Sequence, residues 1–292
     1  MTPALIGAVL PVQTLRDVPA LRSAVEALKS DGKPLVLVPT MGALHDGHMA
    51  LVEEGRRHGR HVVVSIFVNP KQFGPNEDLD AYPRREAKDA QMLTAAGVDI
   101  LWAPPVEVMY PQGFATNIGV SGVSEGLDGA ARPGHFDGVA TVVTKLFNQV
   151  RPDVAIFGQK DYQQLAVIRR MVADLDMGIE IVGLPTQRAE DGLALSSRNA
   201  YLSEDERKAA LALPRALGEA KRQIEKGDPV DGALAKAVAT LAAHGFDPID
   251  YVTLCDATTL EPMHVADRPG RLLGAAKLGT TRLIDNIAVD PA

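Results

Sequence analysis

The sequence is poor in cysteine, has no long apolar run and has no excess of basic residues. Its one cysteine, Cys255, can form neither an internal disulfide nor a four-cysteine metal site, and its place in YVTLC predicts a buried position in a strand. No apolar run approaches the roughly 18 residues that cross a bilayer, so we expect no membrane protein. Acidic residues outnumber basic ones, 37 to 30, and the formal charge of −7 argues against a dedicated nucleic-acid-binding protein.

The amino-terminal segment lacks the features of a secretory signal. Residues 1–20 have no basic region ahead of their short apolar stretch, and Pro11 interrupts that stretch. We therefore expect a cytoplasmic protein. A length of 292 residues with 46% apolar residues excludes a disordered chain and suffices for one large domain or two modest ones, each with its own core.

Short β-branched runs alternate with helical patterns over the first part of the chain. This alternation predicts a parallel sheet with helices on both faces, which is a doubly wound, Rossmann-like α/β domain over residues 1–185. The expected strands are residues 35–38, 61–68, 98–102, 153–157 and 179–184, and the expected helices are residues 49–59, 79–96, 137–152 and 162–175.

The composition changes after about residue 185. Residues 204–243 are rich in Ala, Leu, Lys and Glu and predict two helices separated by Gly227–Pro229. Ser203 and Glu206 have the spacing of a capping box at the start of the first helix. Strand-like segments follow at residues 249–254, 271–277 and 281–284. We therefore expect a second, smaller α+β domain over residues 186–292, with the LSSRN segment at its start.

Polar residues gather where the predicted parallel strands end, which is the edge at which open α/β sheets bind ligands. The first expected strand leads into PTMGALHDGH, with His45 and His48 beside Gly42 and Gly47, while the phosphate loops GxxxxGK[ST] and GxGxxG are missing. Glycines that admit an anion, free N–H groups at a helix start and two imidazoles predict a phosphate site. The pair of histidines could also hold a metal, although no HExxH and no third ligand lie nearby. A purely structural role would leave the glycines unexplained.

Two further candidates follow later strands. Lys160 and Asp161 come directly after the fourth expected strand, where a lysine could meet a phosphate or could be a solvated residue paired with its neighbour. In LSSRN, two hydroxyls and the guanidinium of Arg198 could wrap a triphosphate, although Ser-Ser-Arg also occurs in ordinary loops.

Four longer segments occur together in one order and spacing. They are PTMGALHDGHMALV, SIFVNPKQFGPNEDLDAYPR, RPGHFDGVATVVTKLFNQVRPDVAIFGQKDYQQL and DGLALSSRNAYLS. Through them the chain closely resembles the pantothenate synthetase (pantoate–β-alanine ligase) family over most of its first 200 residues. A lone H-x-G-H occurs throughout the wider nucleotidyltransferase superfamily, so the joint match is far more specific. Gln159 and Gln187 depart from forms typical of the family without weakening the resemblance.

The resemblance implies an ATP-dependent condensation of pantoate with β-alanine to pantothenate. Pantoyl adenylate would be the intermediate, and pyrophosphate and AMP would be released. The resemblance also implies Mg²⁺ and a homodimer. The net charge and the lack of a long apolar run predict no nucleic-acid partner and no membrane partner. Two alternatives stand beside it: another H-x-G-H nucleotidyltransferase acting on a small phosphorylated acceptor, and a nucleotide-binding sensor without catalytic activity.

The resemblance assigns roles to individual residues. His48 takes the position of the proton donor, Gln72 and Gln164 would hold pantoate, and Gln72 would also meet β-alanine. The chemistry of its amide, rather than the resemblance, leads us to expect Asn69 to bind substrate in the same way. Asp89 aligns with an acidic residue associated with Mg²⁺, the alternative being a solvated helix face. Tyr82 would cover the pocket or pack beneath it. The implied ATP site consists of Met41, Gly42, Ala43, Leu44, His45, Asp46, Gly47, His48, Gly158, Gln159, Lys160, Asp161, Gln187, Leu195, Ser196, Ser197 and Arg198.

The chemistry of the side chains supports part of this set independently. In-line attack on the α-phosphorus of ATP increases the negative charge on its oxygens and on the departing pyrophosphate. Donors and cations stabilise that charge, and the candidates of this kind are His45, His48, Lys160, Ser196, Ser197, Arg198 and Mg²⁺.

Overall fold

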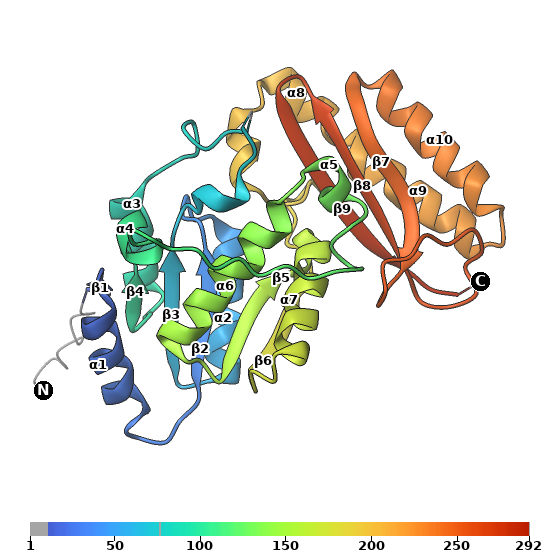
Figure 1. Cartoon of the computed structure of the whole chain (residues 1–292). Helices are drawn as coiled ribbons and strands as arrows, with labels where there is room; N and C mark the ends of the chain where they lie inside the picture. Colours follow the sequence, from blue (N-terminus) through green and yellow to red (C-terminus); the bar gives the residue numbers. More distant parts are fainter. Residues whose placement is uncertain (1–10, 76, 292) are drawn as a thin grey trace, which may run out of the picture.

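The computed structural model describes residues 11–75 and 77–291, and within them two α/β units lie side by side (Figure 1). The first contains a parallel sheet of six strands in the order β1-β4-β3-β2-β5-β6. Its strands are β1 (Gln13–Leu15), β2 (Leu35–Thr40), β3 (His61–Ile66), β4 (Ile100–Trp102), β5 (Val154–Gly158) and β6 (Glu180–Leu184). The chain runs outward from β2 to β3 and β4 and then returns to the other side of β2, so the strand order reverses between β2 and β5. The Rossmann-like fold is confirmed.

Helices cover both faces of this sheet. On one face α1 (Val18–Lys29), α6 (His135–Val150) and α7 (Tyr162–Asp174) form a core that includes Leu35 and Leu37 of β2. On the other face α2 (Asp46–His58) and α3 (Glu86–Ala95) form a core that includes Val36 and Val38. Successive side chains of a strand point to opposite faces, so a continuous apolar run such as LVLV serves both cores.

Short elements fill the connections. They are η1 (Pro70–Gln72) after β3, α4 (Val106–Met109) after β4, α5 (Asp128–Ala131) before α6, η2 (Gln159–Asp161) after β5, and η3 (Ser197–Tyr201) after β6. Four of these, η1, α4, η2 and η3, follow strands at the carboxyl edge of the sheet.

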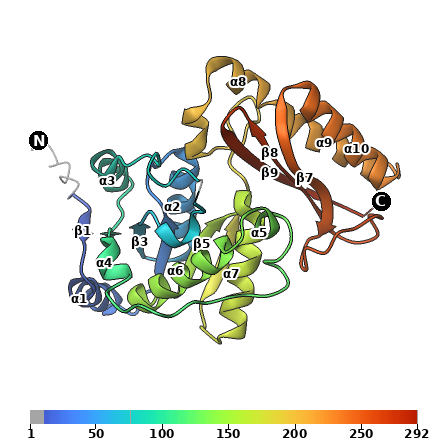
Figure 2. The same ribbon diagram turned by 45° about the horizontal axis from the view of Figure 1, so that its top comes forward.

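The second unit is a three-stranded antiparallel sheet with helices on one side. Its elements are α8 (Glu204–Ala209), α9 (Ala212–Glu225), α10 (Val230–Ala243), β7 (Phe246–Asp256), β8 (Gly270–Leu278) and β9 (Thr281–Val289), with sheet order β7-β8-β9. Its core is separate from the cores of the first unit. The sheet lies between the helices α9 and α10 and the first unit (Figures 1 and 2). Its free face therefore looks toward the carboxyl edge of the parallel sheet.

Two elements near the start of the described chain were not expected from the sequence. The parallel sheet has six strands rather than five because β1 adds to its edge beside β4, and α1 follows β1 directly. The start of α1 carries an ordinary signal, since the Asp17 side chain accepts a hydrogen bond from the N–H of Ala20 at 2.9 Å. Pro19, within the first turn, fits the same pattern.

Three predicted helix boundaries were wrong. The helix expected from residue 79 begins at Glu86, because Pro83 disfavours helical geometry at Tyr82. The helix expected from residue 49 begins at Asp46, since His45 is its N-cap. Residues 204–243 form three helices rather than two. Pro214 has no N–H and would clash with the carbonyl four residues earlier, so α9 starts anew after α8.

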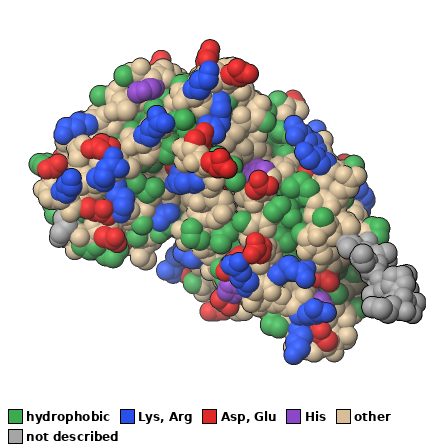
Figure 3. All heavy atoms as spheres, turned by 180° about the vertical axis from the view of Figure 1, so that it is seen from behind, with side chains coloured by type: hydrophobic (Ala, Val, Ile, Leu, Met, Phe, Trp, Pro, Cys, Tyr) green, Lys and Arg blue, Asp and Glu red, His purple; other side chains and the backbone are tan. Residues whose placement is uncertain are grey.

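Other expectations agree with the structure. The capping box of Ser203 and Glu206 is present, and Cys255 is fully buried in β7. In the described part of the chain, no helix has the length and apolar character that a membrane span requires. The prediction that residues 1–20 lack a secretory signal concerns a segment of which the structure describes only residues 11–20. On the face shown in Figure 3, basic and acidic side chains are interspersed, so that face carries no broad field of one sign.

Candidate active site

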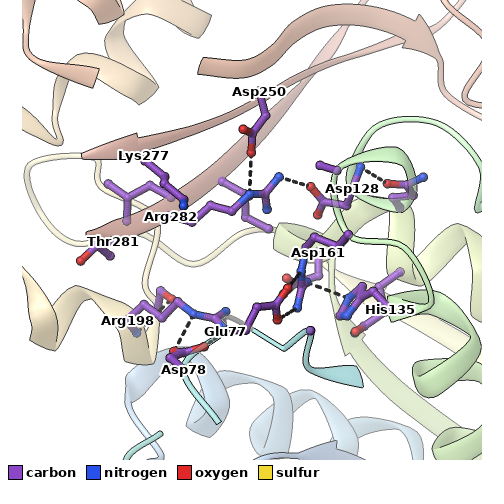
Figure 4. Close-up of a pocket in the computed structure, with 18 of the residues that line it drawn as sticks. Glu77, Asp78, Asp128, His135, Asp161, Arg198, Asp250, Lys277, Thr281 and Arg282 are labelled. Carbon is purple, nitrogen blue, oxygen red and sulfur yellow. Dashed lines mark hydrogen bonds and ion pairs between the residues drawn. The ribbon is translucent and has the colours of Figure 1, made fainter. Parts of the chain in front are cut away.

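Two connected cavities lie at the point where the strand order reverses. We call the smaller one, of about 230 Å³, the inner cavity, because the segments that follow β2 and β5 of the parallel sheet border it. We call the larger one, of about 1030 Å³, the outer cavity, because it extends to the second sheet (Figure 4). Open α/β sheets bind ligands at this reversal because the loops after the two central strands diverge there. The cavities share the lining residues Gln72, Phe73, Arg132, His135, Lys160, Asp161, Gln164, Ser196 and Arg198.

The two histidines after β2 are held by the backbone at the start of α2. Nδ1 of His45 accepts the N–H of Gly47 at 3.1 Å, and Nδ1 of His48 accepts the N–H of His45 at 3.4 Å. The ring centroids are 4.1 Å apart. A Cβ at Gly47 would lie 2.9 Å from the His45 ring, so only glycine fits there. Because each Nδ1 accepts a hydrogen bond, the proton of each neutral ring sits on Nε2.

Both histidines are neutral in the folded protein. Burial lowers the pKa of His48 to about 3, with further lowering by His45 and Lys160. Burial also lowers the pKa of His45, again with a contribution from Lys160. A neutral imidazole with its proton on Nε2 is a hydrogen-bond donor rather than an acid. The proton-donor role implied for His48 therefore becomes, in this geometry, donation of an Nε2 hydrogen bond.

The depressed pKa values predict how stability depends on pH. His48, with a pKa of about 3, and His135, whose pKa burial and Arg132 lower to about 4, bind protons more weakly in the folded protein than their ordinary value of 6.5. The unfolded chain therefore takes up extra protons below pH 6.5. We expect the free energy of unfolding contributed by these rings to be fully present above pH 6.5 and to fall as the pH decreases toward 4.

Urea unfolding measured between pH 7 and pH 4.5 tests this expectation. The variants His48→Gln and His135→Gln lose the titrating group, so their stability should fall less steeply with decreasing pH than that of the wild type. Slopes identical to the wild type in both variants would contradict the assignment.

Asp89 anchors the turn between β2 and α2. Its side chain is 1% exposed, and its two oxygens accept the N–H groups of Ala43 and Leu44, each at 2.9 Å. Gly42, at φ +83°, brings the chain close to this carboxylate. Asp89 is therefore not on a solvated helix face, and it lines neither cavity. Its position accounts for the shape of the Met41–His48 turn.

Gln72 and Asn69 were both expected to bind substrate, and the structure places them differently. Gln72 lines both cavities and donates to the sulfur of Met41 at 3.1 Å. Asn69 is 1% exposed and lines neither cavity. Its amide donates to Gln72 and to the carbonyl of Gly138, each at 3.0 Å, and its oxygen accepts from Tyr110 at 2.7 Å and from the N–H of Lys71. Asn69 thus holds Gln72 in place, with its own hydrogen-bonding capacity used.

The packing of α6 explains how Gln72 reaches the cavity. A Cβ at Gly138 would lie 2.3 Å from the carbonyl oxygen of Lys71 and 2.8 Å from Cα of Gln72. Glycine at this position therefore lets α6 approach η1 directly. The same helix supplies an apolar wall to the inner cavity, formed by Val139, Val142, Val143 and Leu146.

Gln164 has a free amide. It lines both cavities, and among the described residues its side chain has no hydrogen-bond partner. Its neighbour Gln163 is buried and bonds instead to the backbone of the α5 region, including the carbonyl of Gly126 at 2.8 Å. A free amide beside an apolar wall suits a small ligand with hydroxyl groups and methyl groups.

Lys160 is held by the second unit. Asn286 of β9 donates to the backbone carbonyls of Gln159 at 3.0 Å and Lys160 at 2.7 Å. The ammonium of Lys160 borders both cavities and lies 3.8 Å from the Asp161 carboxylate, with a side chain that is 20% exposed. The Gln159 amide donates to the carbonyl of Gly183 at 3.0 Å, so it is turned toward β6.

The LSSRN segment closes the same cavity from β6. Ser196 caps η3 by accepting the N–H of Arg198, and Ser197 donates to the carbonyl of Ala43 at 3.3 Å. Arg198 binds both oxygens of Asp78, at 2.9 and 3.1 Å. Gln187 lines the inner cavity, and its backbone carbonyl accepts the N–H of Leu195. The two candidate segments after β2 and β6 are thus in direct contact.

Several residues at the site were not singled out from the sequence. Arg132 and His135 line both cavities, and Glu77 and Asp78 each bind an arginine there (Figure 4). Their segments, FGPNEDL and RPGHFDG, were recognised, but the pairing of residues 55 positions apart is a property of the fold. Tyr82 both packs and borders the cavity: it is 6% exposed, with its ring edge-on to Phe73, and lines the inner cavity.

The chain is similar to known proteins along almost its whole length. The family model for pantoate-beta-alanine ligase matches residues 13–288. A pantothenate synthetase of Rhizorhabdus wittichii is 67% identical over 281 residues, covering 96% of this chain and 100% of that protein. A pantothenate synthetase of Caulobacter vibrioides is 55% identical over 278 residues, covering 94% of this chain and 98% of that protein.

Solved structures agree with these matches. The crystal structure of pantothenate synthetase from Thermus thermophilus has a TM-score of 0.90 at 48% identity and covers 96% of this chain and 100% of that one. The crystal structure of pantoate-beta-alanine ligase from Francisella tularensis, complexed with beta-gamma ATP and β-alanine, has a TM-score of 0.80 at 32% identity. It covers 94% of this chain and 97% of that one.

Proposed function

The chain belongs to the pantoate–β-alanine ligase family and joins pantoate to β-alanine with ATP, and we propose that the cavities between β2, β5 and β9 are where it does so. One observation carries the assignment of the site: the neutral histidine pair, Lys160 and the free amide of Gln164 converge on the inner cavity. The match over residues 13–288 favours this ligase over a nucleotidyltransferase with a phosphorylated acceptor.

The polar rim of the inner cavity is proposed to bind ATP. The Nε2–H groups of His45 and His48 are donors for phosphate oxygens, and the N–H groups of Gly47 and His45 hold these rings in place through Nδ1. Lys160 adds a compact positive charge. The guanidinium of Arg198, which binds Asp78 in this structure, would bind two phosphate oxygens in place of that carboxylate. Further contacts of this proposal come from positions that line the inner cavity: Met41, Gly47, Gly158, Asp161, Gln187, Leu195, Ser196 and Ser197. Five positions of the ATP site expected from the sequence line neither cavity: Gly42, Ala43, Leu44, Asp46 and Gln159.

The apolar side of the same cavity is proposed to bind pantoate. The methyl groups of pantoate suit the wall formed by α6, and the amides of Gln72 and Gln164 can both donate to and accept from its hydroxyl and carboxylate groups. Asn69 would act by positioning Gln72 rather than by touching the substrate. This division places the pantoate carboxylate toward the histidines and Lys160.

In the first step, a carboxylate oxygen of pantoate forms a bond to the α-phosphorus of ATP, and the bond between that phosphorus and the bridging oxygen to the β-phosphate breaks. Pyrophosphate leaves and pantoyl adenylate remains. The negative charge grows on the phosphate oxygens, where the Nε2–H of His48 and the ammonium of Lys160 can stabilise it. Both groups are fixed before the reaction, so little reorganisation is needed.

In the second step, the neutral amine of β-alanine attacks the carbonyl carbon of pantoyl adenylate. The bond from that carbon to the phosphate oxygen breaks, AMP leaves, and the nitrogen loses a proton as the amide forms. An acyl adenylate is already activated, so positioning of the amine is the main requirement.

Mg²⁺ is expected with the nucleotide, and we infer that its ligands come mainly from the nucleotide. Within the described residues no three His, Cys, Asp or Glu side chains are grouped to hold a metal. Both oxygens of Asp89, the residue expected to bind Mg²⁺, are used by backbone N–H groups. Mg²⁺ commonly keeps water and phosphate ligands. We therefore propose that the metal arrives as the MgATP complex and is held by phosphate oxygens.

Asp89→Asn tests this revised role. The amide keeps one acceptor and turns an NH₂ group toward a backbone N–H, so the turn loses one anchor. We expect a loss of about 1–3 kcal/mol in the free energy of unfolding and a rise in KM for ATP of about tenfold, with the Mg²⁺ dependence at saturating ATP unchanged. A shifted Mg²⁺ midpoint with wild-type stability and KM would restore Asp89 as a metal ligand.

Three further features are proposed on the family resemblance. The chain divides into domains at residues 1–185 and 186–292, which accords with the end of β6 at Leu184 and with the separate core of the second unit. The protein forms a homodimer and works in the cytoplasm. Sedimentation equilibrium at micromolar concentration gives the mass of two chains if the dimer proposal is right, and of one chain if it is wrong.

The reaction itself is tested by mixing the protein with ATP, Mg²⁺, pantoate and β-alanine. AMP and pantothenate should form in equal amounts, and AMP formation should need both organic substrates. Turnover that needs a phosphorylated acceptor and gives no amide would favour the alternative hypothesis, a nucleotidyltransferase that acts on such an acceptor.

A further inference from the structure

Arg132 lies at the junction of the two cavities and has no role in the steps described so far. It follows α5 and precedes α6, its side chain is 15% exposed, and it lines both cavities. A buried guanidinium at an active site is costly unless its charge is paired. Its pairing in this structure therefore indicates what it is built to bind.

A carboxylate is already docked on Arg132. Nε and Nη2 donate to the two oxygens of Glu77 at 2.7 and 2.6 Å, which is the two-pronged geometry of an arginine with a carboxylate. Burial raises the pKa of Glu77, but the hydrogen bond and charge of Arg132 outweigh burial and leave this pKa below its ordinary value. Glu77 is thus ionised, and the pair is a true ion pair.

The other side of Arg132 is fixed by neutral groups. Nη1 donates to Nε2 of His135 at 2.9 Å, and Nη2 donates to the backbone carbonyl of Gln72 at 3.3 Å. A guanidinium has no acceptor, so Nε2 of His135 must accept, and its Nδ1–H donates to the same Gln72 carbonyl at 2.8 Å. These contacts fix the guanidinium beside Gln72 without neutralising its charge. Glu77 is its one ion-pair partner among the described residues.

Other cations around the cavities have other engagements. Arg282 is bound to both Asp128 and Asp250, and Lys71 lies over the rings of Tyr110 and Phe114. Lys160 and Arg198 belong to the proposed phosphate site. Lys277, on β8, borders the outer cavity from the second unit and does not line the inner one. Three cations, Arg132, Lys160 and Arg198, line both cavities, and Arg132 is the one that bonds to Gln72 and has no other proposed ligand.

β-Alanine needs such a cation. Its amine must lie at the acyl carbon held near Gln72, while its carboxylate, two methylene groups away, enters from the outer cavity. We propose that Arg132 binds the carboxylate of β-alanine in the two-pronged geometry that Glu77 now makes, and that this contact selects a β-amino acid over a simple amine. The proposal rests on the pantoate–β-alanine ligase function. The carboxylate of Glu77, whose side chain is 25% exposed, then competes with the carboxylate of β-alanine for the guanidinium of Arg132.

The test compares two amines in wild type and Arg132→Gln. The amines are β-alanine and 3-aminopropanamide, which has the same length with a neutral end. Because Arg132→Gln removes the charged partner of a partly buried carboxylate, we expect kcat/KM for β-alanine to fall about 10²-fold and kcat/KM for the amide to change less than about threefold. An equal fall for both amines would overturn the proposal, since it would mean a structural role.

One further measurement, made on the wild type and on Arg132→Gln, separates failure of the first step from failure of the inference. Pantoate-dependent exchange of pyrophosphate into ATP, run without β-alanine, reports the first step alone. If the wild type shows no exchange, the proposed function fails. If the wild type shows it and Arg132→Gln loses it, the inference about Arg132 fails, whereas retained exchange in Arg132→Gln supports it.

Glu77→Gln and Lys277→Gln complete the set. Removing the competing carboxylate should lower KM for β-alanine several-fold, and an unchanged or higher KM would contradict the competition. Lys277→Gln removes the same positive charge from the wall formed by β8. It should leave the preference for β-alanine over the amide unchanged, and loss of that preference would reassign the carboxylate site to Lys277.

Discussion

Replacing His48 with alanine is expected to lower the rate of pantoyl adenylate formation by about 10²-fold or more, the loss typical of a removed transition-state donor. The ring is fixed by the N–H of His45 at Nδ1 and borders the inner cavity. Its pKa of about 3 makes it neutral at physiological pH, so it acts through Nε2–H. Single-turnover formation of the adenylate with MgATP and pantoate measures the effect directly.

The variant His48→Gln separates a neutral donor from an acid. A glutamine amide offers an N–H but cannot serve as a proton source at neutral pH. If His48 works as a neutral donor, His48→Gln should recover at least about tenfold of the activity lost in His48→Ala. Equal rates in the two variants would restore the proton-donor role. Part of the effect of alanine is the lost cap on α2, worth about 1 kcal/mol, which urea unfolding measures separately. A wild-type rate in His48→Ala would refute any role in this step.

Replacing Lys160 with methionine is expected to lower the same rate by about 10²-fold or more. Methionine keeps most of the length and loses the charge that would stabilise the phosphate oxygens. The backbone of Lys160 is held by Asn286 of β9, so the loop should keep its place in the variant. Pantoate-dependent exchange of pyrophosphate into ATP is the appropriate measurement, because it does not involve β-alanine.

Lys208→Met is the matched control for this loss of charge. Lys208 lies on α8 with a side chain that is 74% exposed, paired with Asp205 on the same helix. Its removal should leave the exchange rate within about twofold of the wild type, as expected for an exposed ion pair. An exchange rate within about threefold of the wild type in Lys160→Met would show that the first step does not depend on this ammonium.

The location of the site could be predicted from the sequence because it follows from strand order. Strands alternating with helices predict a parallel sheet, and the segments after β2 and β5 must then meet at its carboxyl edge. His45, His48, Lys160 and Gln164 lie there as expected. The capping box of Ser203 was equally visible, because its two partners are three residues apart.

What the sequence could not provide were contacts between distant segments. The sequence alone indicates only that Asp89 is an acidic residue on a helix. The structure shows that its carboxylate accepts the N–H groups of the turn some 45 residues earlier. Asn69 resembles a substrate ligand until its four hydrogen bonds are traced. Arg132 carries no local signal at all, since its partner Glu77 comes from another loop.

The net charge of −7 is likewise uninformative about the site. Two arginines line both cavities, and in this structure each is paired with a carboxylate from one short loop, Arg132 with Glu77 and Arg198 with Asp78. A protein that is acidic overall can therefore present guanidinium groups to anionic substrates. The local arrangement of charge, and not its sum, decides what binds.

The central claim is that the carboxylate of pantoate attacks the α-phosphorus of ATP within the inner cavity. The measurement that tests it most directly uses pantoate labelled with ¹⁸O in both carboxylate oxygens, with ATP, Mg²⁺, β-alanine and the wild-type protein. If pantoyl adenylate forms, one labelled oxygen stays on phosphorus when the amine displaces AMP, so the AMP carries one ¹⁸O and the pantothenate amide keeps the other. AMP without label, formed together with pantothenate, would contradict the account.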